Sequence, residues 1–177
     1  MKIKIMSDIK RYTDGRGLPH KFMCLFYYNG IYALLIYRTL NYLYERKNFL
    51  YKLLYSILFF VLYIPFRNIT GVELHPQAKI GRGVFIPHCT NIIISKDAII
   101  GENLTIHQSV TIGVNYNNNK APLIGDNVFI SCNSTLIGNI KIGNNVTILP
   151  NSCVTKSCEL DGSLLGGVPA HQIIKGS

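Results

Sequence analysis

With two interruptions, an aliphatic residue recurs at every sixth position through the second half of the chain. Each of these lead residues is Ile, Leu or Val: Leu74, Ile80, Ile86, Ile94, Ile100, Ile106, Ile112, Ile124, Ile130, Leu136, Ile142, Ile148 and Val154. A period of six fits neither an α-helix, which repeats about every 3.6 residues, nor a flat strand, which alternates at every second residue. The spacing predicts a chain that turns a corner every six residues and stacks on itself as a solenoid.

Three six-residue sides would close one triangular coil of about eighteen residues. Lead residues one coil apart should then stack about 4.8 Å from one another, as hydrogen-bonded strands do. The column expected from this spacing comprises Ile94, Ile112, Ile130 and Ile148. Asparagine tolerates the left-handed backbone of tight turns, and the expected corner residues are Asn103, Asn127, Asn144 and Asn145. The alternative, an Ile-rich β-sandwich, has no reason to keep a six-residue phase.

The six-residue phase is interrupted at two places. From Ile86 to Ile94 the step is eight residues, so two extra residues enter the coil, and we expect them near residues 91–93. The second interruption, residues 113–123, spans two periods and keeps the phase, but it has lost the repeat and is largely polar. It predicts an extended loop. Insertions in repeat proteins often map to a functional face, and a solvated bulge is the alternative.

The first 70 residues differ from the rest in charge and composition. Residues 1–70 contain eleven Lys and Arg against three acids, a net charge of +8, whereas residues 71–177 have a net charge of +1. Ten of the eleven Tyr residues also lie in the first part, where apolar residues recur at near-helical spacing. We therefore expect a helical N-terminal region at 1–70 and the solenoid at 71–177.

Within the helical region, residues 49–66 carry a single charge, Lys52. This stretch meets the minimum length for a membrane span, but its many Tyr and Phe residues and the closing Pro65 favour a helix packed on the solenoid or on another subunit. Peripheral contact with an anionic membrane is the second interpretation, because the region is basic and rich in Tyr. The basic charge also suggests nucleic acid, but no base-reading motif is present, so no nucleic acid is expected.

The five cysteines lack the paired spacing of zinc ligands. They are Cys24, Cys89, Cys132, Cys153 and Cys158. The first residues are basic and polar rather than an apolar run, so no secretory signal is expected. We expect free thiols, no metal, and a cytoplasmic location, either in solution or at the inner face of the cytoplasmic membrane.

Residues that could carry chemistry lie beside the first coils. His88 follows the core residue Ile86 by two positions, so it should point away from the axis of the prism. Glu73 and His75 lie in the preceding side. A carboxylate near an imidazole orients the ring and stabilises its charged form, which suits a general base near neutral pH. His107 also lies next to a core Ile and is the second candidate base, and a solvated surface histidine is the alternative for each.

Four segments together resemble the hexapeptide-repeat acyltransferases, and most closely their serine acetyltransferase branch. They are His-Pro-x-Ala-x-Ile-Gly-x-Gly at 75–83, Gln-Ser-Val-Thr-Ile-Gly at 108–113, Ile-Gly-Asn-Ile at 137–140 and Gly-Gly-Val-Pro-Ala at 166–170. The resemblance covers nearly the whole chain. It implies a left-handed parallel β-helix preceded by helices, a homotrimer, and acetyl-CoA as the acyl donor.

The resemblance also implies roles for particular residues. His88 falls on the family's catalytic base, which takes the proton of the acceptor hydroxyl. Glu73 falls where the serine enzymes carry an Asp that holds this histidine, so the longer carboxylate is a departure. The family binds CoA in a groove between neighbouring subunits, and the residues that would line it here are Gly113, Cys132, Pro150 and Lys156.

The departures from the serine enzymes concern the acceptor. Those enzymes have Asp before the catalytic histidine, where this chain has Pro87, and an Arg-His pair where it has Lys120 and Ala121. A free amino acid would leave its charges poorly paired at such a site. We therefore expect an acetyl-CoA-dependent O-acetyltransferase acting on a sugar hydroxyl in capsule, exopolysaccharide or lipopolysaccharide biosynthesis. Serine O-acetyltransferase of cysteine biosynthesis and a non-catalytic solenoid scaffold are the alternatives.

Overall fold

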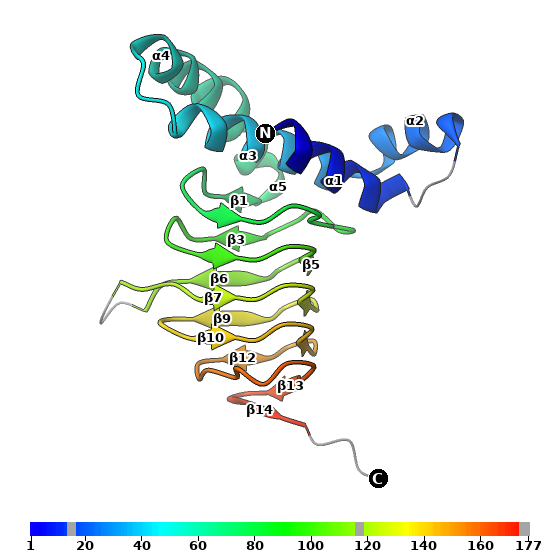
Figure 1. Ribbon diagram of the computed structural model, residues 1–177, viewed down its shortest axis with the longest axis vertical. Helices are drawn as coiled ribbons and strands as arrows, with labels where there is room; N and C mark the ends of the chain where they lie inside the picture. The colour runs from blue at the N-terminus through cyan, green and yellow to red at the C-terminus, as the bar shows by residue number, and fades with distance from the viewer. Residues whose placement is uncertain (14–16, 116–118, 174–177) are drawn as a thin grey trace.

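The chain folds into a layer of helices that lies on one end of a three-sided column of β-coils (Figure 1). The computed structural model describes residues 1–13, 17–115 and 119–173. The helices are α1 (Lys2–Thr13), α2 (Leu18–Tyr27), α3 (Asn29–Tyr44), α4 (Phe49–Leu58), the π-helical η1 (Phe59–Tyr63) and α5 (Ile64–Thr70). The last three follow one another without a break and form one helix of 22 residues.

Short strands form the three faces of the column. The first face contains β1 (Glu73–Leu74), β3 (Ile93–Ile94), β6 (Thr111–Gly113), β9 (Thr135–Ile137) and β12 (Cys153–Val154). The second face contains β2 (Lys79–Ile80), β4 (Ile99–Ile100), β7 (Leu123–Ile124) and β10 (Lys141–Ile142). The third face contains β5 (Thr105–Ile106), β8 (Phe129–Ile130), β11 (Thr147–Ile148), β13 (Leu164–Gly167) and β14 (Ala170–Gln172). All pairings are parallel except that of β13 with β14.

The aliphatic ladder fills the inside of this column. Each of the thirteen lead residues has 3% or less of its surface exposed. Small partners such as Ala78, Val110 and Ser134 are buried beside them. Burying one aliphatic side chain of this size contributes about 1.5–3 kcal/mol, so stacking of the coils is the main source of stability. The predicted solenoid is confirmed, and the sandwich alternative is excluded.

The vertical stacking of the ladder differs from the predicted column. Ile112 lies between Ile94 and Leu136 on the first face. Ile130 lies on the third face, where it pairs with Ile106. The prediction that Ile94, Ile112, Ile130 and Ile148 form one column was therefore wrong. The segment between β6 and β7 spans two periods of sequence but joins one face directly to the next, so every later lead residue lies one face away from its predicted place.

The segment between β6 and β7 extends away from the column (Figure 1). It corresponds to the loop predicted at 113–123, of which residues 116–118 lie outside the described residues. Its two described ends are tied together, because Asn119 N donates to Asn115 O at 2.9 Å. The loop therefore leaves the column and returns at one place without disturbing the stacked coils.

Left-handed backbone recurs at the corners of the coils. Asn103, Asn127 and Asn145 have φ values of 59°, 56° and 56°, as expected of asparagine at tight turns. The prediction for Asn144 was wrong, because its backbone is not left-handed. Its side-chain Oδ1 instead accepts a hydrogen bond from Asp126 N at 2.8 Å, which ties one coil to the next.

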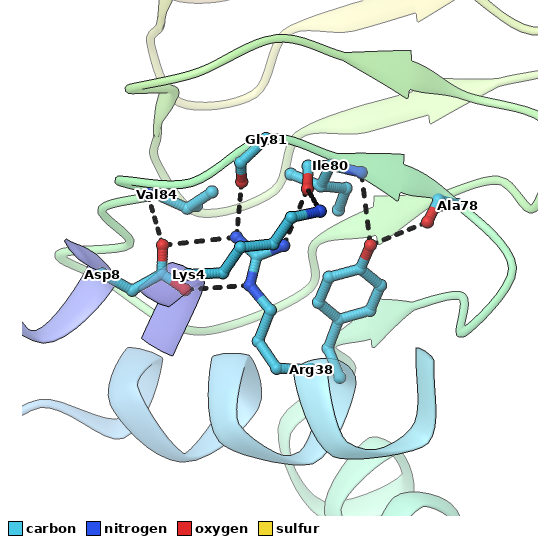
Figure 2. Close-up of polar contacts among 8 residues, drawn as sticks. Lys4, Asp8, Arg38, Ala78, Ile80, Gly81 and Val84 are labelled. Atoms are coloured by element: carbon cyan, nitrogen blue, oxygen red, sulfur yellow. Dashed lines mark hydrogen bonds and ion pairs between the residues drawn. The ribbon is translucent and has the colours of Figure 1, made fainter. Parts of the chain in front are cut away.

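Side chains of the helical layer hydrogen-bond the free edge of the first coil (Figure 2). Inner coils pair with a coil on either side, but the first coil has none before it. Arg38 Nη1 donates to Ile80 O at 2.7 Å, and Arg38 Nε lies 2.9 Å from Asp8 Oδ2. Asp8 Oδ1 accepts from Val84 N at 2.8 Å. The Arg38 and Asp8 side chains are only 1% and 4% exposed, so a buried ion pair joins the helices to the column.

The boundary between the two parts lies between Thr70, where α5 ends, and Glu73, where β1 begins. One continuous core nevertheless includes side chains from both parts, such as Tyr37 from α3 and Ile80 from β2. The division into a region at 1–70 and a domain at 71–177 therefore stays a prediction about independent folding.

Candidate active site

A two-residue bulge in the first coil carries His88. Asn91 and Ser109 mark the same corner in two successive coils, with φ values of 49° and 58°. Between this corner and the preceding buried Ile, the first coil has two residues more than the second. The extra residues therefore lie at 87–90 rather than near 91–93 as predicted. Counting residues reveals that the phase is interrupted, but it does not reveal where within the coil the extra residues are accommodated.

The bulge forms one wall of an open cavity of about 480 Å³. The opposite wall is the junction of α2 with α3, and the lining residues are Tyr27, Tyr28, Asn29 and residues 87–90. Gly30 permits this close approach, because a Cβ atom there would collide with the carbonyl oxygen of Ile86. A cavity of this volume is within the usual range for small-molecule sites.

The imidazole of His88, which lines this cavity, lies next to that of His107. The ring centroids of His88 and His107 are 6.0 Å apart, and the His107 ring lies 5.1 Å from that of Phe129. His88 is exposed, whereas His107 is half-buried in the wall of the column. Burial, and to a lesser extent the neighbouring His88, lowers the pKa of His107. Neutral imidazole can accept a proton, so the pair is suited to general-base chemistry.

Within the described residues, no hydrogen bond or ion pair joins Glu73 to His88. Glu73 Oε2 lies 3.6 Å from Arg67 Nη1 instead, and both side chains are more than a third exposed. Glu73 also acts on His75, whose pKa is lowered mainly by burial while the carboxylate partly opposes the shift. The predicted catalytic pair of His88 and Glu73 is therefore not assembled by contact, and its role stays a prediction.

The predicted CoA-binding residues lie along two opposite edges of the first face. Cys132 and Pro150 lie at the corner before this face, where Asn151 N donates to Cys132 O at 3.1 Å and stacks the two coils. Gly113 ends β6, and Lys156 follows β12, at the other edge. One copy of the chain thus presents them on one surface without closing a cleft around them, and the intersubunit groove stays a prediction. Among the described residues, no cluster of His, Cys, Asp and Glu could hold a metal ion.

Sequence reasoning missed the helical wall of the cavity. Tyr28 has extended backbone, with φ of −102° and ψ of 104°, between two helices. The Asn29-Gly30 pair was the available signal, since such a pair breaks a helical pattern. Gln108 was also missed as a site residue. Its Oε1 atom is buried without a partner among the described residues, directly after His107, and a bound ligand can satisfy such an atom.

The family described as bacterial transferase hexapeptide (six repeats) matches residues 121–156. The serine acetyltransferase of Staphylococcus epidermidis is 36% identical over 146 residues, which cover 81% of this chain and 65% of that protein. The chain therefore spans slightly less than two thirds of the length of this relative.

Solved structures extend the likeness over nearly the whole chain. The serine acetyltransferase of Neisseria gonorrhoeae in complex with serine superposes with a TM-score of 0.83 and 27% identity, covering 98% of this chain and 69% of that chain. A serine acetyltransferase in complex with CoA gives a TM-score of 0.79 and 27% identity, covering 97% and 68%. The chain is therefore similar to the hexapeptide-repeat transferases at residues 121–156 and to serine acetyltransferases over most of its length. The left-handed β-helix preceded by helices is thereby confirmed.

The comparisons contradict the predicted sugar acceptor. The relatives described above are serine acetyltransferases. The assignment to capsule, exopolysaccharide or lipopolysaccharide biosynthesis was therefore wrong. That assignment depended on the departures at Pro87, Lys120 and Ala121 and on the short, basic helical region, whereas the likeness to the serine enzymes extends over most of the chain. Loss of a few charged contacts weakens an argument for one acceptor, but it does not identify another.

Proposed function

We propose that this chain is an acetyl-CoA-dependent O-acetyltransferase that acetylates the hydroxyl group of serine. The observation that carries the proposal is the likeness, over 98% of the chain, to a serine acetyltransferase in complex with serine. The likeness to a serine acetyltransferase in complex with CoA supports acetyl-CoA as the donor. The exposed imidazole of His88 on a cavity of suitable size supports a catalytic rather than a scaffolding role.

His88 is the proposed general base. Its imidazole takes the proton of the serine hydroxyl as that oxygen attacks the carbonyl carbon of the thioester. A C–O bond forms, the C–S bond breaks, and the imidazolium returns its proton to the departing thiolate, which gives O-acetylserine and CoA. Backbone N–H groups would stabilise the oxyanion. Cys89 is a poor nucleophile for an alternative covalent route, because burial raises the pKa of its thiol to about 12.

Glu73 is the proposed positioning residue for His88. Its present partner, Arg67, lies 3.6 Å away at a partly exposed site, where ion pairs are weak. Rotation of the Glu73 side chain towards His88 would give the imidazolium a carboxylate partner. Glu73→Gln should then lower the pKa that governs kcat/KM, because the charged imidazole loses its stabilisation. A pH profile that is unchanged in this variant would remove Glu73 from the mechanism.

We propose that acetyl-CoA binds between copies of the chain in a homotrimer. Gly113 and Cys132 are half-buried, and Pro150 and Lys156 are exposed, so all four are available to a ligand that lies along the first face. The Lys156 ammonium suits a phosphate group. Gly113 has no side chain and lets a ligand approach its backbone closely.

Release of CoA from acetyl-CoA in the presence of L-serine tests the proposal directly. The wild-type chain should release CoA, and His88→Ala should lower the rate by about 10²–10⁴-fold. The variant should still bind CoA in calorimetry, since His88 acts on the acceptor. Release with a hexose but not with serine would refute the proposed acceptor. Absence of CoA binding by the wild-type chain would refute the enzymatic assignment and leave the scaffold.

We also propose a reducing, cytoplasmic compartment for this protein. Cys89, Cys132, Cys153 and Cys158 are free thiols, and Cys89 is buried. Free thiols persist where glutathione and thioredoxin keep them reduced. Labelling of all five thiols after denaturation, without prior reduction, would agree with this location.

A further inference from the structure

The helix formed by α4, η1 and α5 has a large apolar surface that the described residues leave uncovered. It is long and apolar enough to cross a membrane, yet only 6% of its most apolar stretch is buried. Exposed fractions reach 74% for Phe49, 69% for Leu50 and 70% for Phe60. A contiguous exposed surface of this kind marks an interaction site, and the proposed acetyl transfer makes no use of it.

The exposed apolar residues at the beginning of α4 form a broad face of the helix rather than a narrow stripe. The residues Phe49, Leu50, Tyr51, Leu53 and Leu54 are all exposed. Successive residues of a helix point about 100° apart, so these side chains form one broad face that spans about 200° of the helix circumference. The core of the layer lies against only one side of a helix. A broad exposed apolar face is typical of a helix that lies in a membrane interface with that face buried in lipid.

The charge near this helix complements an anionic surface. Residues 46–72 contain Arg46, Lys47, Lys52 and Arg67; the flanking acids are Glu45 and Glu73, of which Glu73 pairs with Arg67. The helical region as a whole has a net charge of +8. Anionic lipid headgroups attract such a region. A second copy of the same chain would bring the same positive charge to the contact and would be repelled, so the charge favours lipid over self-association.

The attachments of the helix favour a position in the plane of a membrane. α4 returns along α3, where the rings of Tyr44 and Tyr55 lie 5.9 Å apart. At the other end, Asn91 N donates to Thr70 O at 3.0 Å and fixes the helix to the column. Crossing a bilayer would break these contacts or draw α3, with its buried Arg38, into lipid. Lying in the interface requires neither change.

We propose that the helical layer docks on an anionic lipid surface, with the apolar side chains of residues 49–62 inserted at headgroup level. α2 presents a second group of exposed apolar side chains in the same layer: Phe22, Met23 and Phe26. Both helices lie at the end of the molecule remote from the last coils (Figure 1). The column would then project into the aqueous phase.

Sedimentation of the full chain with lipid vesicles tests this proposal independently of catalysis. The chain should sediment with vesicles of phosphatidylcholine and phosphatidylglycerol, less with phosphatidylcholine alone, and less as salt rises from about 0.1 M to about 0.5 M. The double variant Leu50→Glu/Phe60→Glu should bind at least about tenfold more weakly. Lys47→Glu/Lys52→Glu should abolish the preference for anionic vesicles. Leu160→Glu, at an apolar residue 62% exposed on the last coil, is the matched control and should bind like the wild type.

Three results would overturn the proposal. The first is wild-type protein that stays in the supernatant with anionic vesicles. The second is a Leu50→Glu/Phe60→Glu variant that binds as the wild type does. The third is a Leu50→Glu/Phe60→Glu variant with a lower mass than the wild type in lipid-free ultracentrifugation, together with a wild type that does not bind vesicles. This result would make the surface a contact between copies of the chain. Circular dichroism of each variant shows whether the helices have formed.

Discussion

Replacing Arg38 by Ala removes one half of the buried ion pair that joins α3 to the first coil. The Asp8 carboxylate, 4% exposed, would lose its counter-charge, and breaking a buried pair in this way destabilises a protein by about 3–5 kcal/mol. The carbonyl of Ile80 would keep the Lys4 ammonium at 3.1 Å, but that of Gly81 would lose its Arg38 donor. For a chain of this size the change corresponds to a fall in Tm of about 6–20 °C.

Thermal and urea denaturation followed by circular dichroism measure this loss. The double variant Arg38→Met/Asp8→Leu should recover part of it, because no uncompensated charge remains in the interior. Arg82→Ala is the control, since the Arg82–Glu102 pair is of similar length, 2.8 Å, but is about half exposed, and its loss should be below about 1 kcal/mol. An Arg38→Ala variant that loses no more stability than Arg82→Ala would refute the conclusion that this pair secures the helical layer.

Other consequences concern the cavity and its imidazoles. His107→Ala should lower CoA release with L-serine far less than His88→Ala, and a larger effect would make His107 the base. Gly30→Ala should destabilise the chain by about 1–3 kcal/mol in urea denaturation, because its Cβ has no room, whereas Gly17→Ala, with only an ordinary contact at 3.8 Å, should be nearly neutral. Burial lowers the pKa of His75 and of His107, so the unfolded chain binds more protons than the folded chain as pH falls below about 6.5. Tm should therefore decrease as the pH is lowered from about 7 to about 5, and His75→Gln should reduce this decrease. A His75→Gln variant with the pH dependence of the wild type would contradict this account.

The ladder made the architecture predictable, because only a three-sided coil places a lead residue inside at every sixth position. Its phase predicted burial for residues as distant as Leu74 and Val154, and both are buried. The vertical order was not predictable, because the loop after Gly113 could equally have spanned one face or two. Only the pairing of Ile112 with Leu136 shows which is the case.

The candidate site was predictable in its main residue and not in its surroundings. His88 stood out as a polar residue two positions after a core Ile, and it lines the cavity. Tyr27 and Asn29 could not be predicted there, because nothing in their local sequence indicates which coil they will face. Glu73 was placed near His88 by family resemblance alone, whereas in the structure its carboxylate lies against Arg67. The pattern along a chain specifies which side chains leave the core, but not which of them meet.

The reversed strand β14 closes the far end of the column. It pairs antiparallel with β13 from Leu165–Gln172 to Gly167–Ala170, and so covers a row of backbone groups spaced like the edge of another coil. An uncovered row of this kind is a template on which a strand of a second molecule can add. A chain shortened after Pro169 would present that template, and we would expect two such chains to pair through their last coils, because the helical layer covers the first coil of each.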